Sequence, residues 1–306
     1  MDLFKKRETV IQNITYMALM AAINVVFVLL TALLTPLMFL MVFILPMTSA
    51  VVTLFCKKRY FPIYFVATMG LCLLTTSALY IWDTFFYVLP SLITGFVFGL
   101  VIEKQVPSIF IILLTTVVQY IISLLTFIII KSIVPELNYI EVLLGMFGLK
   151  EFAYKEVFAH IFIYTISSIQ MVLTYFVLRR EIKKLGFEIN LIVSNPTIVF
   201  VLNLMIIIMS FVSFFIYQPI VYVFLIMNLP LFVFELVEIS MEKKAIDYVL
   251  LGLSVLVSSG IFLFFYNLLP HPYGLILIAP LYLLVGVIYF LNYLFNIKTK
   301  NDKIGI

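Results

Sequence analysis

Charged side chains are scarce in this sequence. Only 11% of the 306 residues are Asp, Glu, Lys or Arg, whereas 65% are hydrophobic and the mean hydropathy is +1.23. Soluble domains carry about 25% charged residues. A soluble core of this size cannot hide so much apolar surface, so the solvent for most side chains must be lipid. The net charge of +4 is too small and too dispersed to indicate nucleic-acid binding.

Cysteine and histidine are also rare, with two of each. Cys56 and Cys72 form no CxxC motif, and we expect no disulfide between them. The sequence has no HExxH, GxSxG or GxxxxGK[ST] motif, and no GxGxxG in the required context. These absences predict a protein that is not an enzyme and that has no metal site and no cofactor. Active transport would then need a partner ATPase or an ion gradient.

Long apolar stretches fill most of the chain. A membrane span needs ~20 apolar residues, and ten stretches qualify: 12–33, 37–55, 61–81, 85–102, 108–130, 157–178, 197–217, 220–240, 247–268 and 273–295. Prolines mark several of the joints between them. The pattern predicts an all-α polytopic integral membrane protein with about ten transmembrane helices. The second and third stretches are the ones that we expect to be tilted or shortened.

Basic residues cluster at every second gap between these stretches. Sixteen of the 19 Lys and Arg fall into six groups: Lys5–Arg7, Lys57–Arg59, Lys104, Arg179–Lys184, Lys243–Lys244 and Lys298–Lys303. Loops rich in Lys and Arg stay in the cytoplasm. The alternation therefore predicts a cytoplasmic N-terminus and C-terminus.

Polar and aromatic side chains inside or near the spans are candidates for a ligand site. Such residues are costly in lipid and face the interior of a bundle. The candidate ligand-binding residues are Asn24, Tyr80, Trp82, Asp83, Gln119, His160 and Tyr164. Hydrogen bonding between helices is the alternative explanation for the amides, and an aromatic belt is the alternative for Trp82. The mixed segment 132–156 is either an interfacial connector or a lid over the site.

Two acids lie at the inner end of the eighth stretch. Glu235 and Glu238 are three residues apart, so they share one helix face. Asp247 opens the ninth stretch close by, and Lys243 and Lys244 are near enough to neutralise these acids. We interpret the group as a cytoplasmic ion-pair cluster in preference to an ion-coupling site.

Small residues in the first stretch form the segment ALMAA. Ala18 and Ala22 are one helical turn apart, and such small-xxx-small pairs let another helix approach closely. They are the candidate partner-contact residues.

The N-terminal part, about residues 8–180, resembles the substrate-binding S components of energy-coupling factor transporters. The resemblance rests on six spans, ALMAA, the Pro36 corner, and LPSLITGFVFGLVIEK at 89–104, which contains Pro90, Gly95 and Gly99. The full length is more similar to the YybS-like membrane proteins of Firmicutes. The resemblance implies a six-helix domain at 1–185 that binds a vitamin-like solute. It also implies contact of Ala18 and Ala22 with a transmembrane coupling subunit, and energy from separate ATPases.

Four further spans, in the extension 186–306, depart from the S-component pattern. The leading hypothesis is a small-solute-binding transport subunit without its own ATPase. The alternative is a non-transporting scaffold or envelope assembly protein. Lipid movement is a weaker third reading.

Overall fold

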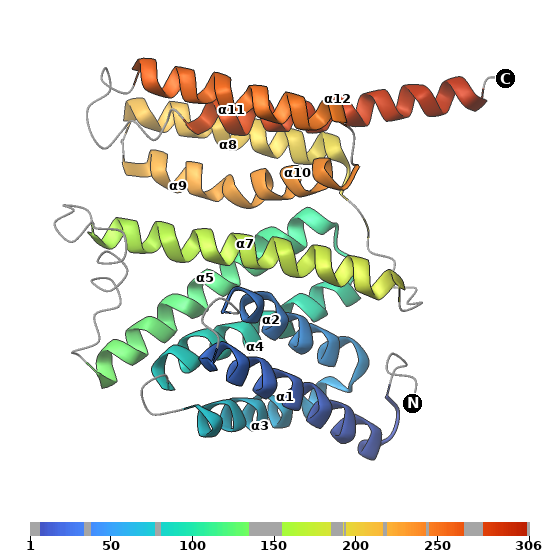
Figure 1. Cartoon of the computed structure of the whole chain (residues 1–306), viewed down its shortest axis with the longest axis vertical. Coiled ribbons are helices and arrows are strands. Elements are labelled where there is room, and N and C mark those ends of the chain that lie inside the picture. Colours follow the sequence, from blue (N-terminus) through green and yellow to red (C-terminus); the bar gives the residue numbers. More distant parts are fainter. Residues whose placement is uncertain are drawn as a thin grey trace. The chain divides into compact units, whose positions relative to one another are not determined.

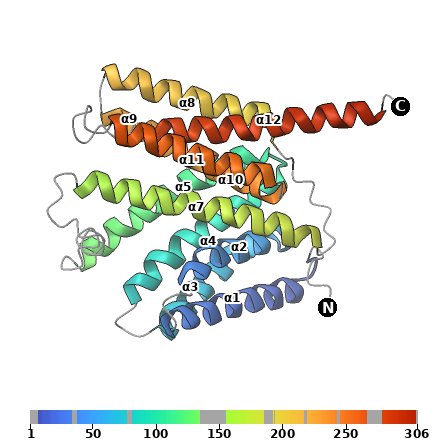
Figure 2. The ribbon, with the colours of Figure 1, turned by 45° about the horizontal axis from the view of Figure 1, so that its top comes forward.

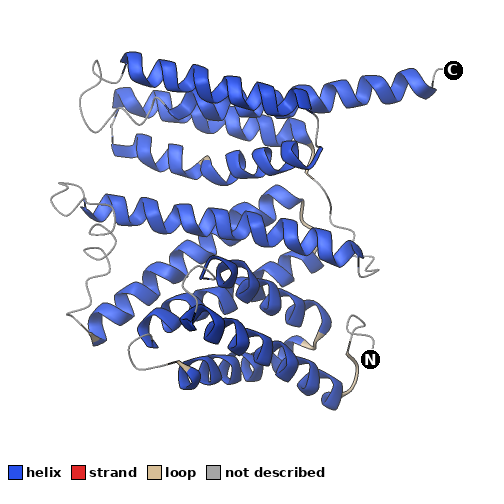
Figure 3. Ribbon diagram, viewed as in Figure 1, coloured by secondary structure: helices blue, strands red, loops and turns tan. Residues whose placement is uncertain are grey.

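The chain folds into two compact units, Met1–Ile192 and Val193–Ile306. The structure is a computed structural model that describes residues 7–33, 38–76, 81–134, 155–184, 192, 194–216, 219–242, 245–265 and 278–304. Every regular element in these ranges is a helix (Figures 1 and 3). Cys56 and Cys72 are both free thiols.

The helices of the first unit follow the apolar stretches of the sequence, because a helix satisfies its own backbone hydrogen bonds without water. A short 3-10 turn, η2, occupies Lys58–Tyr60. The helices are α1 (Val10–Leu33), α2 (Met38–Phe55), α3 (Phe61–Thr75), α4 (Ile81–Glu103), α5 (Ser108–Ile133) and α7 (Lys155–Lys184). Helix α4 packs against α2, α3 and α5, and α7 packs against α2 and α5. Figures 1 and 2 show α7 running beside α5.

The second unit contains α8 (Pro196–Ile216), α9 (Pro219–Met227), α10 (Leu229–Glu242), α11 (Ala245–Phe265) and α12 (Ala279–Ile304). Helices α8, α10 and α11 each pack against α12. Because α9 ends at Met227 and α10 begins at Leu229, the predicted stretch 220–240 is interrupted at Asn228. Pro230 explains the interruption, since it has no N–H to continue the helical hydrogen-bond ladder.

Seven helical segments among the described residues are long and apolar enough to cross a membrane. This confirms the predicted all-helical class, and the apolar helices fit a multi-pass membrane protein. Helix α3, with 15 residues, is shorter than a full span, as expected for the third stretch, whereas α2 runs over 18 residues, Met38–Phe55, close to the predicted 37–55. The count of ten spans stays a prediction.

Two glycines let α4 pack directly on α2. A Cβ added at Gly99 would lie 2.6 Å from the Cβ of Thr53 and 2.8 Å from the carbonyl oxygen of Ala50. One added at Gly95 would lie 2.5 Å from the Cβ of Ser49. These separations are below van der Waals contact, so the two helix backbones approach more closely than any side chain allows. The Ser49 hydroxyl uses this approach to donate to the carbonyl of Leu92 at 2.7 Å.

The start of α1 is tied to the end of α2 through polar contacts. The backbone N–H of Arg7 donates to the carbonyl of Phe55 at 2.8 Å. The N–H of Lys57 donates to Asn13 Oδ1 at 2.7 Å. The Arg7 guanidinium also lies 4.8 Å from the centre of the Tyr16 ring, a cation–π arrangement. These contacts fix the end of the unit that carries two of the basic clusters.

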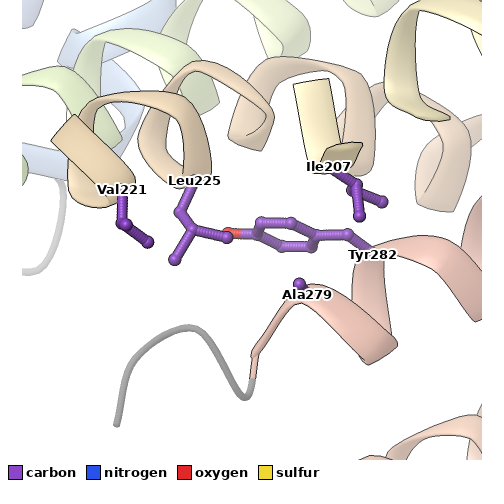
Figure 4. Packing of buried hydrophobic residues seen from close by; sticks show 5 residues of the cluster. All are labelled: Ile207, Val221, Leu225, Ala279 and Tyr282. Carbon is purple, nitrogen blue, oxygen red and sulfur yellow. The ribbon is translucent and has the colours of Figure 1, made fainter. Parts of the chain in front are cut away.

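A hydrophobic cluster joins α8, α9 and α12 in the second unit. Figure 4 shows the Tyr282 ring of α12 lying between Ile207 of α8 and Leu225 of α9. Val221 and Ala279 complete the cluster. Since all five side chains are buried, this cluster holds α9 in place on one side of the interruption at Asn228.

The glycine contact predicts a large effect from a single methyl group. Gly99→Ala should destabilise the protein by about 1–3 kcal/mol, because the added Cβ forces α4 away from α2. Gly70→Ala in α3 is the matched control, since nothing lies within 4 Å of a Cβ there. Thermal unfolding of the detergent-purified variants measures both. Equal midpoints for the two variants would contradict the close packing.

Candidate functional site

Three helices of the first unit are joined by a chain of polar side chains. Gln119 of α5 donates from Nε2 to Oε1 of Gln170 on α7 at 3.0 Å. Gln170 donates in turn from its own Nε2 to the hydroxyl of Ser91 on α4 at 3.1 Å. All three residues are buried. The chain therefore places amide and hydroxyl groups inside a bundle whose outer surface is apolar.

Further polar atoms on the same helix faces have no partner among the described residues. They are Gln119 Oε1 and the hydroxyls of Thr94, Thr116 and Thr174. Each threonine lies three or four residues from a member of the chain, so it shares its helix face. We call Ser91, Thr94, Thr116, Gln119, Gln170 and Thr174 the polar seam. An unpaired buried polar group costs about 1–3 kcal/mol, so the seam is suited to a polar molecule that would pair with it.

The seam carries no charge of its own. All six residues are neutral amides or hydroxyls, which both donate and accept hydrogen bonds. A bound anion would call for Arg or Lys, and a bound metal cation would call for carboxylates. The seam therefore suits an uncharged solute with its own donors and acceptors.

His160 and Tyr164 form a separate group on α7. The Tyr120 hydroxyl lies 3.0 Å from His160 Nδ1, and the Tyr120 and Tyr164 rings meet edge to face with 5.4 Å between centroids. Tyr164 is buried, while His160 is exposed. Because Tyr120 follows Gln119 directly, it points about 100° around α5 from the seam. The candidates His160 and Tyr164 therefore lie near each other, apart from Gln119.

Asn24 belongs to a third polar group, shared by α1, α2 and α3. Its Nδ2 donates to the Tyr64 hydroxyl at 2.9 Å, and its Oδ1 accepts from the Thr48 hydroxyl at 2.7 Å. Asn24, Thr48 and Tyr64 are all fully or almost fully buried. Because both ends of the Asn24 amide have a partner, the group acts as a cross-link between helices.

The aromatic and acidic candidates near the start of α4 are only partly described. Trp82 is half-buried in the first turn of the helix. Tyr80, the side chain of Asp83 and most of the segment 132–156 lie outside the described residues. The predicted ligand-binding set thus contains one member of the seam, Gln119.

Ala18 and Ala22 are exposed on the surface of α1, whereas Ala21 between them is buried. The two small side chains therefore face away from the interior of the first unit. This placement leaves them accessible to another helix.

Sequence reasoning overlooked the hydroxyl members of the seam. Ser91 and Thr94 are three residues apart, as are Thr116 and Gln119, and this spacing within apolar spans is the pattern that identifies them. It also misjudged Glu235, which was assigned to a cytoplasmic ion-pair cluster. Glu235 is fully buried and is hydrogen-bonded to Asn203 of α8, while Lys243 and Lys244 lie outside the described residues.

Comparison with known proteins assigns this chain to no family. No family model, no curated protein and no solved structure matches the chain. The resemblance to S components and to YybS-like proteins therefore stays a hypothesis carried by the motifs quoted above.

The amide pair at the centre of the seam predicts energetic coupling between two residues 51 positions apart. Gln119→Leu and Gln170→Leu should each leave a buried partner unpaired, so the double variant should lose less stability than the sum of the single variants. The expected coupling is about 0.6 kcal/mol and at most about 1.7 kcal/mol. Unfolding free energies of the four proteins in detergent measure it.

A control pair for this cycle combines Gln119→Leu with Gln12→Leu. Gln12 is exposed near the start of α1 and bonds only to its local backbone. Distant, independent substitutions add within about 0.5 kcal/mol. Additivity of the Gln119 and Gln170 variants to the same degree would show that the amide bond contributes no stability.

Proposed function

We propose that this chain is a transport-related membrane protein whose first unit binds a small, neutral, vitamin-like solute at the polar seam. It has ten spans with both termini in the cytoplasm, as the basic clusters indicate. It lies in the bacterial plasma membrane and has no ATPase of its own. The unpaired polar atoms of the seam are the observation that carries the proposal.

Unpaired polar atoms are especially costly when the bundle is surrounded by lipid. In a soluble protein, water would reach such groups at little cost, but inside a bundle surrounded by lipid it is scarce. Gln119 Oε1 is an unpaired acceptor, and the three threonine hydroxyls are donors and acceptors. A bound neutral solute would satisfy them together, which supports a binding role over a purely structural one.

The partner surface is the second part of the proposal. Exposed alanines at 18 and 22 leave a shallow strip along α1, where a helix of a coupling subunit would pack closely. ATPases attached to that subunit would supply the energy. The same strip also favours the second candidate function, a scaffold that binds another membrane protein and no solute.

Solute binding predicts stabilisation by neutral vitamins. Riboflavin and nicotinamide are the neutral probes, with anionic biotin as the comparator. A neutral probe that binds should raise the thermal midpoint, with a gain of about 2.7 kcal/mol at one hundred times its Kd. Gln119→Leu should abolish the shift, and Gln12→Leu should retain it.

A failure of every neutral probe, together with a purified protein that carries no small molecule by mass spectrometry, would reject the solute-binding function. A shift that Gln119→Leu leaves unchanged would move the binding site away from the seam.

The partner surface predicts a specific loss of copurifying subunits. Ala18→Leu combined with Ala22→Leu should release the partner membrane protein and its ATPases, because bulky side chains hold the partner helix away. The fold should be unaffected, since both positions are exposed. Ala67→Leu, at an exposed position of α3, is the matched control. If affinity purification recovers the same partners from all three proteins, the strip is not a contact surface.

A further inference from the structure

The second unit contains a carboxylic acid deep in a membrane-spanning segment. Glu235 lies within the apolar range Val223–Met241, and its exposed fraction is 0%. A charged side chain in the middle of a membrane helix costs several kcal/mol, and such residues are found where function needs them. The position therefore requires a physical account of how the acid is held.

One neutral amide provides the hydrogen bonds to this acid. Asn203 Nδ2 lies 3.0 Å from Oε1 and 2.9 Å from Oε2 of Glu235, and 3.2 Å from the carbonyl oxygen of Tyr282. An amide nitrogen has two hydrogens, so it cannot satisfy three acceptors at once. An ionised carboxylate, which accepts about four hydrogen bonds, would be poorly satisfied here.

A second amide extends the group to the helix interruption. Asn228, between α9 and α10, donates from Nδ2 to Asn203 Oδ1 at 2.8 Å. Asn228 is fully buried, and its Oδ1 has no partner among the described residues. The cluster thus contains a free acceptor beside the break in a membrane helix. Interrupted helices of this kind form ion and substrate sites in transporters.

Gly286 of α12 makes room for the cluster. A Cβ at this position would lie 2.6 Å from Asn203 Nδ2 and 3.4 Å from Glu235 Oε1. Any larger residue would displace the amide from the acid. By contrast, a Cβ at Gly252 or Gly260 of α11 would meet nothing within 4 Å.

No cation compensates the acid within the described residues. Helices α8, α9, α10 and α11 contain no Lys, Arg or His between their ends. The lysines of α12 begin at Lys298, about 18 Å along the helix from Gly286 at 1.5 Å per residue. An ionised Glu235 would therefore be a buried charge with no counterion among the described residues, and that state is strongly unfavourable.

The other described titratable side chains around α10 are acids and phenols. Glu238 lies on α10 itself, and helix α8 has no titratable side chain. The side chains of Glu242 on α10, of Tyr222 on α9 and of the charged residues of α12 from Lys298 onward lie outside the described residues. The remaining groups are Asp247 and Tyr248 on α11 and Tyr282, Tyr289 and Tyr293 on α12. None of them favours a negative charge on Glu235, so the resting side chain is the neutral acid.

We propose that Glu235 is a proton-binding site in the second unit, and that it takes up and releases one proton during the working cycle of the protein. Loss of the proton converts the acid to a carboxylate and passes H⁺ to water. The Asn203 amide then holds the carboxylate through two contacts, and the interruption at Asn228 gives the local backbone room to adjust. This role is independent of solute binding in the first unit.

Infrared difference spectroscopy of the full-length protein in nanodiscs tests the site directly. A protonated carboxylic acid has a C=O band that a carboxylate lacks. The wild type should show this band at neutral pH and lose it in alkaline buffer. Glu235→Gln should lack the band, whereas Glu238→Gln and Asp247→Asn should retain it.

Thermal unfolding provides a second readout. Deprotonation leaves an uncompensated buried charge, so the wild-type midpoint should fall between mildly acidic and alkaline buffer, and the Glu235→Gln midpoint should fall much less. If Glu235→Gln does not fold, Glu235→Asp replaces it. The shorter acid loses the Asn203 contact, so its C=O band should shift in frequency.

Three outcomes would overturn the proposal. The first is a C=O band that persists in Glu235→Gln. The second is a band that is lost in Asp247→Asn instead. The third is stabilisation of the wild type, and not of Glu235→Gln, by sodium chloride over choline chloride at fixed pH, which would assign the site to a metal cation.

Discussion

Each polar group inside these helices has lost water as a hydrogen-bonding partner, and the rest of the structure depends on how that loss is met. The backbone meets it by forming helices in both units, since a helix satisfies its N–H and C=O groups internally. Side chains meet it by pairing across helices, as Asn24 does with Tyr64 and Thr48. Where pairing is incomplete, the structure leaves groups that something else must satisfy.

The two units leave different groups unsatisfied. In the polar seam of the first unit, the unpaired groups are neutral: Gln119 Oε1 and three threonine hydroxyls. In the cluster around Asn203 of the second unit, the incompletely satisfied group is the acid Glu235, whose only hydrogen bonds among the described residues come from Asn203. Neutral donors and acceptors suit an uncharged solute, while an acid without a counterion suits a proton. The chemistry of the unsatisfied groups at each site therefore favours a different ligand.

The sequence predicted the helices well because apolar length and proline positions are local properties. It also placed Gln119 inside a span. It did not reveal that Gln119 meets Gln170 or that Asn203 meets Glu235, since these pairs form only when distant helices pack. Glu235 was misplaced for a related reason. The nearby lysines suggested a local ion pair, but a new helix, α10, begins at Leu229, and its orientation turns the acid toward α8 and α12.

The free energy that one proton releases on crossing the membrane can be compared with the free energy that solute accumulation requires. Moving one proton across 100 mV releases about 2.3 kcal/mol, and each tenfold concentration ratio of a solute costs about 1.4 kcal/mol. One proton per solute would thus sustain a gradient of roughly fifty-fold. A neutral solute gains nothing from the membrane potential by itself, so the seam alone drives no accumulation. On the proposed function, the energy would come either from ATPases docked through Ala18 and Ala22 or from the proton carried by Glu235. Disrupting each site separately therefore identifies the source of energy.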